Sequence, residues 1–166
     1  MQPDILIRPY LPSDADATIE IFLRAIREVS AKDYSVAQVN AWARVEDRAG
    51  WAERRGSRPA WIAESDGQAI GFTDLVADGY LDMMFVHPGW QGLGVASRLL
   101  RRVEEAACAL GVHRIYTEAS ITARPFFLRR GFHLLRSQVV EKRGERLDNF
   151  LMEKPISGNV LTADLR

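Results

Sequence analysis

A hydrophobic strand, a glycine-containing turn and an amphipathic helix follow one another in residues 80–110. The turn carries Gln91, Gly92 and Gly94, and the apolar residues of the following helix recur at helical spacing. Two glycines at a helix N-terminus leave room beside backbone N–H groups that have no partner within the helix. The helix dipole also favours an anion at this end. We therefore predict that the turn binds a phosphate or pyrophosphate group of a ligand.

Three other interpretations of this glycine turn fit its sequence less well. A P-loop needs a lysine and a hydroxyl residue at fixed positions after its glycines, and neither is present. A dinucleotide-binding turn needs a third glycine and a repeated βαβ fold, and this chain has too few parallel units. A glycine turn without a ligand is disfavoured, because both glycines lie together at the helix start beside the polar Gln91.

The length of 166 residues fits one domain, which we place at residues 1–155, with a polar tail at 156–166. The 22 basic and 22 acidic side chains cancel, which disfavours an extended nucleic-acid surface. The single cysteine, Cys108, cannot form an internal disulfide, and no apolar run approaches the roughly 20 residues needed to cross a bilayer. With no secretion signal visible, we expect a cytoplasmic protein without a membrane or nucleic-acid partner. No His/Cys/Asp cluster has metal-ligand spacing, so we expect no metal.

The hydrophobic pattern predicts an α+β fold, with a mainly antiparallel sheet and one central parallel βαβ unit. The crossover rule makes the strand after the long helix parallel to the strand before it. Strands are expected at residues 5–8, 61–64, 70–76, 80–86, 114–119, 132–141 and 147–154. Helices are expected from the Ser13–Asp14 cap to Val29, after Ser35, at 95–110 and at 122–130, with a short helix or turn at 47–57.

Several segments resemble the GNAT superfamily of N-acetyltransferases. Residues 91–96, Gln-Gly-Leu-Gly-Val-Ala, resemble the superfamily's Gln/Arg-x-x-Gly-x-Gly/Ala signature, and residues 119–132 resemble its motif B, which ends in a Gly-Phe pair. The order of elements agrees from Ile5 to Lys154, so the resemblance covers nearly the whole chain. Shorter segments resemble the bacterial YafP-like group of the superfamily: Tyr34 with Ala41-Trp42-Ala43, Ser120-Ile121-Thr122-Ala123, and Asn149-Phe150.

The resemblance implies a three-layer fold in which the parallel strands splay apart to hold acetyl-coenzyme A (acetyl-CoA). It also implies transfer of the acetyl group to an amine of a small-molecule acceptor, by direct attack in a ternary complex. The turn would hold the diphosphate, and the backbone of Phe85 and Val86 would pair with the pantetheine arm as an added strand. A backbone N–H near Val86 would face the thioester oxygen, a kind of contact that contributes roughly 3–4 kcal/mol in other enzymes. The expected cofactor-binding residues are Phe85, Val86, Gln91, Gly92, Leu93, Gly94, Val95, Ala96, Ser97, Ser120 and Phe127.

Motif B departs from the family pattern at two positions. Phe127 stands where many members carry a tyrosine that protonates the departing thiolate, and Ser120 stands where an asparagine is common. Phenylalanine cannot donate a proton, so we considered Tyr116 and Tyr80 as donors by their strand positions. The candidate bases are Asp82 and Glu118, although each also fits a structural or solvated strand carboxylate.

The acceptor site is expected between the first two helices and the last hairpin, with apolar walls from Tyr34, Trp42, Phe126 and Phe127, and a polar contact from Asn149. These residues do not distinguish whether the acceptor is a small amine, an amino sugar or a protein. Because of Phe127, the alternative is a non-catalytic acyl-CoA-binding or sensor module on the same fold. Two further alternatives are a homodimer through exposed apolar parts of the last strands and a docking face on the first two helices.

Overall fold

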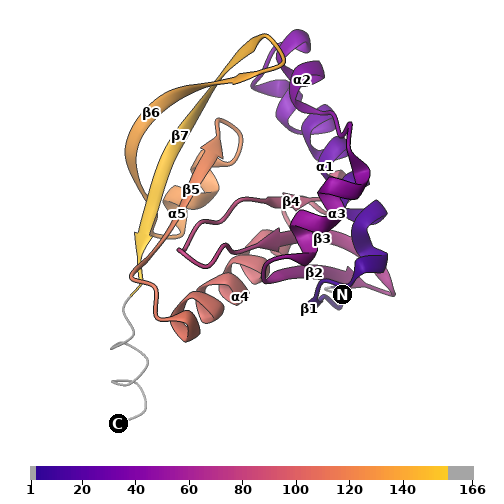
Figure 1. Cartoon of the computed structure of the whole chain (residues 1–166), viewed down its shortest axis with the longest axis vertical. Coiled ribbons are helices and arrows are strands. Elements are labelled where there is room, and N and C mark those ends of the chain that lie inside the picture. Colours follow the sequence, from indigo (N-terminus) through magenta and orange to yellow (C-terminus); the bar gives the residue numbers. More distant parts are fainter. Residues whose placement is uncertain (1–2, 157–166) are drawn as a thin grey trace.

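Two antiparallel sheets diverge from a single shared point and are covered by helices (Figure 1). The computed structural model describes residues 3–156, so the N-terminal two residues and 157–166 of the expected tail lie outside the described residues. The first sheet has the order β1 (Leu6–Pro9), β2 (Ala60–Ser65), β3 (Gln68–Asp74) and β4 (Met84–Val86). The second has the order β5 (Arg114–Ser120), β7 (Glu145–Pro155) and β6 (His133–Lys142).

Helices cover both faces of the first sheet, which makes the three layers expected from the sequence. The apolar side of α1 packs on one face together with Trp51 of α3, whereas α4 packs on the other; α2 lies beside α1 and contacts the β6–β7 hairpin. Gly71 of β3 allows α4 to approach closely, because a Cβ there would lie 3.0 Å from a methyl carbon of Val95. The helices are α1 (Ala15–Glu28), α2 (Val36–Trp42), α3 (Arg48–Gly56), α4 (Val95–Leu110) and α5 (Arg124–Arg129), with short 3-10 turns at Pro12–Asp14, Ser30–Lys32 and Pro88–Trp90.

The sheets separate within the segment predicted as one strand, residues 80–86. Tyr80 forms a parallel bridge with Tyr116 of β5, and the N–H of Leu81 donates to the carbonyl of Tyr116 over 2.9 Å. From Asp82 onward the chain pairs with β3 instead, and regular β4 contains only Met84–Val86. The prediction of one continuous strand is therefore wrong, and the break produces the split between β4 and β5.

Local side-chain bonds explain where two of the helices begin. Ser35 and Gln38 form a reciprocal capping box at the start of α2, with distances of 3.1 and 2.8 Å. The segment 47–57, expected as a short helix or turn, forms α3, whose N-cap Asp47 accepts from the N–H of Gly50.

The last hairpin is longer than predicted because its turn is tighter. Its two turn residues, Arg143 and Gly144, have φ of +46° and +84°, as in a two-residue hairpin turn. Within residues 3–156, no helix has both the length and the apolar character that a bilayer crossing demands.

Candidate active site

A cleft of about 630 Å³ occupies the split between β4 and β5 and reaches the N-termini of α4 and α5. Most of the residues predicted to contact the cofactor line it. Those residues are Phe85, Val86, Gln91, Gly92, Gly94, Val95, Ala96, Ser97, Ser120 and Phe127. Leu93 is 49% exposed and is not among the lining residues, so its side chain points elsewhere than the prediction placed it.

The glycine turn has the backbone conformation that its sequence requires. Gly92 and Gly94 have φ of +74° and +83°, in the left-handed region that favours glycine, and Gly94 is the N-cap of α4. A Cβ at either position would meet no atom within 4 Å, so both glycines face open space. The amide Nε2 of Gln91 donates to the carbonyl of Val86 over 2.9 Å, which ties the turn to the end of β4. The turn therefore presents free amides in an open cradle that suits a phosphate group.

Two arginines beside this turn were missed in the sequence. Arg129 and Arg130 end α5 and line the cleft. The guanidinium of Arg130 donates to the hydroxyl of Ser97 in the first turn of α4 and lies 4.9 Å from the centre of the Phe126 ring. The sequence feature that could have indicated them is the basic pair immediately before Gly131. In the structure this pair adds positive charge to the cleft that contains the predicted phosphate site.

The edge of β4 that faces the cleft offers backbone N–H groups. The N–H of His87 donates to the carbonyl of Ile70 in β3 over 2.8 Å. Since N–H groups of an antiparallel strand alternate in direction, those of Met84 and Val86 point to the opposite edge, toward the split. A backbone donor and an open strand edge thus lie where the resemblance places the thioester and the pantetheine arm.

A second cavity of about 140 Å³ adjoins the cleft on the side of α2 and the β6–β7 hairpin. Three residues predicted to bind the acceptor, Tyr34, Trp42 and Asn149, line it, whereas Phe126 lines the main cleft. The two cavities have lining residues in common, which are Trp42, Asp82, Phe85, Glu118 and Ser120.

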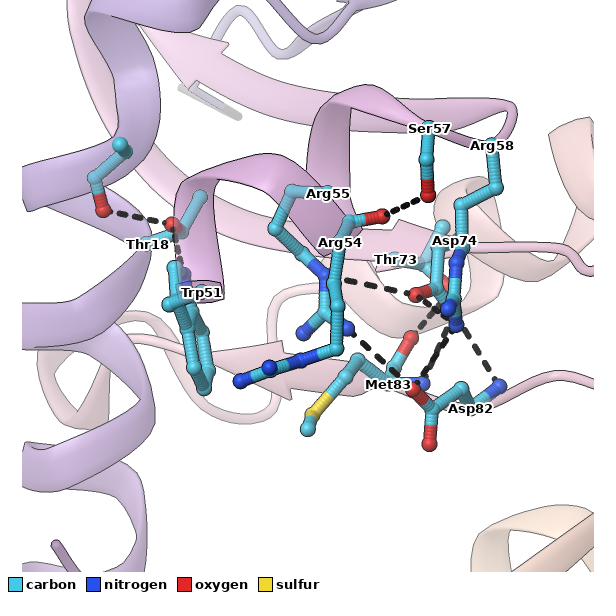
Figure 2. A network of polar contacts seen from close by, with 11 residues as sticks. Thr18, Trp51, Arg54, Arg55, Ser57, Arg58, Thr73, Asp74, Asp82 and Met83 are labelled. Atoms are coloured by element: carbon cyan, nitrogen blue, oxygen red, sulfur yellow. Dashed lines mark hydrogen bonds and ion pairs between the residues drawn. The ribbon is translucent and has the colours of Figure 1, made fainter. Parts of the chain in front are cut away.

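Asp82 belongs to a network of charged side chains that is mostly buried (Figure 2). Its Oδ2 lies 3.2 Å from Nη2 of Arg55 and 3.0 Å from Nη1 of Arg58. Both arginines also lie 3.6 Å from Oδ2 of Asp74. Arg55 is 1% exposed and stacks over the ring of Trp51 at 4.8 Å. These contacts anchor the Asp82 carboxylate through one of its two oxygens, Oδ2.

Burial dominates the titration of this network. It raises the pKa of the Asp74 carboxyl to about 6, against the lowering effects of its backbone hydrogen bond and of Arg55. Burial also lowers the pKa of Arg55, against the raising effects of Asp74 and Asp82. Asp74 therefore takes up a proton as the pH falls below about 6.

Glu118 and Tyr80 lie where the two strands diverge. Glu118 lines both cavities with an exposed side chain, and within residues 3–156 it forms no ion pair or side-chain hydrogen bond. Burial raises the pKa of the Tyr80 hydroxyl, and the neighbouring Glu118 carboxylate raises it further. Tyr80 is therefore protonated at neutral pH, and it lines the second cavity.

Tyr116 does not reach the site. Its hydroxyl donates to Oδ2 of Asp78 over 2.6 Å, its ring stacks on Tyr80 at 5.1 Å, and it lines neither cavity. The expectation that Tyr116 donates a proton is therefore withdrawn, because the turn residue Asp78 holds its hydroxyl away from the cleft.

The remaining predicted side chains have defined structural partners. The hydroxyl of Tyr34 donates to the carbonyl of Asp148 over 2.7 Å and accepts from the N–H of Ile121 over 2.9 Å. The hydroxyl of Ser120 accepts from the N–H of Ala123 over 3.0 Å, which shapes the turn before α5. Phe127 is 4% exposed and packs between other aromatic rings, so its phenyl group belongs to the core as well as to the cleft wall.

Comparisons with known proteins agree with this geometry. Residues 30–154 match the family described as acetyltransferase (GNAT) domain. The chain is 38% identical over 149 residues to the uncharacterized N-acetyltransferase YafP of Escherichia coli (strain K12), an alignment that covers 90% of this chain and 95% of that protein.

Solved structures show the same fold. A GCN5-related N-acetyltransferase from Rhodopseudomonas palustris superposes with a TM-score of 0.88 at 36% identity, over 93% of this chain and 96% of that one. The putative acetyltransferase yncA from Salmonella typhimurium, solved with its cofactor acetyl-CoA, superposes with a TM-score of 0.71 at 21% identity, over 93% of this chain and 95% of that one. By family match, sequence identity and fold, this chain belongs to the GNAT acetyltransferase family.

Proposed function

We propose that this protein is an N-acetyltransferase that transfers the acetyl group of acetyl-CoA to a primary amine of a small molecule. The observation that carries the proposal is the junction of the two cavities at Glu118. One cavity leads to the glycine turn and the other leads to the aromatic pocket under α2, so a thioester and an amine can be bound together. This arrangement supports direct transfer in a ternary complex.

The residues of the main cleft suit the donor. The amides of the Gln91–Ala96 turn and the arginines Arg129 and Arg130 would hold its phosphate groups, and the open edge at Met84 and Val86 would pair with its amide-containing arm. When bound, acetyl-CoA supplies an activated acyl group on a thiol leaving group. The open space beside Gly92 and Gly94 supports this fit, because any side chain there would enter the cradle.

Glu118 is the proposed base. An amine arrives mainly as an ammonium ion, so one proton must leave before the nitrogen lone pair can attack. The Glu118 carboxylate takes this proton, a C–N bond forms to the acyl carbon, and the C–S bond breaks. The nitrogen then loses a second proton and the sulfur gains one, which balances the reaction. A backbone N–H at Val86 is the proposed donor to the acyl oxygen.

The proton for the sulfur is assigned to Tyr80 or to water. Tyr80 is protonated at neutral pH and lies next to Glu118 around the second cavity. A thiol with a pKa near 8.5 is also a tolerable leaving group without assistance. Either source would replace the tyrosine that is usual in motif B, where this chain has the buried Phe127.

A second candidate is a sensor that binds acyl-CoA without catalysis, and the same Phe127 favours it. Calorimetric titration with coenzyme A, followed by thiol release with a panel of amines, separates the two functions. Binding together with thiol release supports the enzyme, and binding without release from any amine supports the sensor. Absence of coenzyme A binding would contradict both.

A further inference from the structure

The second cavity is closed at its far end by the last hairpin. Hydrogen bonds join α2 and the residues before it to the ends of β6 and β7 around the hairpin turn, and no flexible lid is needed to cover this side. Their donor and acceptor atoms are Tyr34 Oη to Asp148 O (2.7 Å), Gln38 Nε2 to Arg146 O (2.8 Å) and Arg143 Nη1 to Ala41 O (2.6 Å). These bonds bridge this end of the cavity, so a polypeptide chain cannot run through the cavity past it.

The volume limits the acceptor further. The cavity measures about 140 Å³, and a dry protein cavity of about 150 Å³ holds one benzene molecule. Its walls include Tyr34, Trp42 and Phe85, with ring centres 5.4 Å apart for Tyr34 and Trp42 and 6.4 Å apart for Trp42 and Phe85. An apolar body about the size of a benzene ring therefore fits within this cavity.

The side chains of Glu118 and Asn149 lie on one face of the second sheet, and each carries a hydrogen-bond acceptor for an amino group. Ser120 of β5 is directly opposite Asn149 of β7, and Glu118 is diagonal to Asn149 on the same face. Diagonal neighbours of this kind are about 7–8 Å apart or somewhat less between Cβ atoms, a span that one nitrogen with two N–H groups can bridge. The Oδ1 atom of Asn149 is buried and has no hydrogen-bond partner within the described chain. A buried acceptor without a partner is costly.

The charge around the cavity favours a cation. Asp82, Glu118 and Asp148 line it together with one basic residue, Lys142. Asp82 is balanced by Arg55 and Arg58, yet Glu118 and Asp148 still outnumber Lys142. A carboxylate on the acceptor would therefore be repelled by Glu118 and Asp148.

We infer that the acceptor is a compact primary amine with an apolar body and no carboxylate, whose amino nitrogen is held between Glu118 and Oδ1 of Asn149. This inference rests on the proposed function and adds the substrate class. It assigns to Asn149 the role of orienting the nitrogen lone pair toward the acyl carbon, while Glu118 takes the proton.

Matched pairs of acceptors test the class. Isopentylamine is compared with leucine, benzylamine with phenylglycine, and both amines with a short peptide that has a free N-terminus. Thiol release from acetyl-CoA should give a kcat/KM at least tenfold higher for each amine than for its amino acid or for the peptide. Equal or better use of the amino acids or the peptide would overturn the inference and leave the acetyltransferase intact, whereas no release with any acceptor would remove the proposed function itself.

Substitution of Asn149 tests the orienting role. Asn149→Leu should raise the KM for isopentylamine at least tenfold and leave the Kd for coenzyme A unchanged, which also reports that the variant is folded. Asn149→Asp keeps an acceptor oxygen and should restore most of the affinity. The exposed Asn40 of α2 provides the control, since Asn40→Leu should change neither constant. An unchanged KM in Asn149→Leu would contradict the assignment.

Discussion

The buried carboxylate of Asp74 accepts a hydrogen bond from the backbone N–H of Met83, with Oδ1 2.9 Å from the nitrogen. The same oxygen accepts from the N–H of Asp82 over 3.1 Å. Two successive N–H groups therefore point to one strand, and the chain leaves β5 for β3 at this position. The split that forms the cleft is thus held open by a side chain of the neighbouring strand.

Removal of this carboxylate should weaken the whole domain. Asp74→Ala leaves both N–H groups without their acceptor and leaves the guanidinium of Arg55 buried beside an empty space. Loss of one partner of a buried ion pair costs about 3–5 kcal/mol in other proteins. The free energy of unfolding in urea should fall by about that amount, while the exposed Glu53→Ala, as a control, should change it little. A loss within the range of the control would contradict the anchoring role.

The same residue predicts how stability depends on pH. Burial raises the pKa of Asp74 to about 6, above the value of 3.8 for an unperturbed aspartate. A group with a raised pKa in the folded state stabilises the fold fully below its unfolded pKa, and this contribution is lost as the pH rises toward 6. The unfolding free energy of the wild type relative to Asp74→Asn should therefore fall between about pH 4 and 6, by on the order of 2–3 kcal/mol. A rise in the unfolding free energy of the wild type relative to Asp74→Asn over this pH range would contradict the prediction.

The glycine turn can be tested with a control at the other end of the same helix. Gly94→Val adds a side chain in the open cradle, and Gly111→Val adds one at the C-cap of α4 with nearly the same left-handed φ, +73° against +83°. Both variants should lose stability through backbone strain, each by roughly 1–2 kcal/mol. Only Gly94→Val should weaken coenzyme A binding, by at least tenfold in calorimetry. Equal affinities in the two variants would place the phosphates elsewhere.

The two carboxylates at the junction of the cavities should differ in their effect on rate. Glu118→Gln removes the proposed base and should lower kcat/KM by about 10²-fold or more, in the range typical of general bases. Asp82→Asn should have the smaller effect on rate, because Arg55 and Arg58 already occupy its Oδ2. Measurement of kcat/KM from pH 6 to 9 checks the order, with Glu53→Gln as the matched control. A larger loss in Asp82→Asn would make Asp82 the base.

Sequence periodicity was sufficient for much of the fold. The apolar stripe of α4, the glycines at both its ends and the Ser35 cap are local patterns, and each element formed where its pattern predicted. The break in residues 80–86 was not predictable in this way. It depends on Asp74, whose side chain reaches across from β3. It also depends on Arg55, in the last turn of α3, and on Arg58, just after that helix.

The candidate site also has features that local sequence predicts and features that it does not. The conformation of the glycine turn follows from the spacing of its glycines, so the lining of the cleft was largely expected. The directions of Tyr116 and Asp82 depend on partners elsewhere in the fold, Asp78 for the first and Arg55 and Arg58 for the second. Residue type and strand position suggested a catalytic role for both, whereas their tertiary contacts argue for structural roles.

Acetyl transfer to a compact amine is the central claim, and steady-state thiol release tests it most directly. Acetyl-CoA and isopentylamine are varied together, and the acetylated amine is counted by mass spectrometry. We expect one acetylated amine for each thiol released and intersecting double-reciprocal lines, as for a ternary complex. Tight binding of coenzyme A with no acetylated product from isopentylamine or from any other amine of the panel would contradict the account.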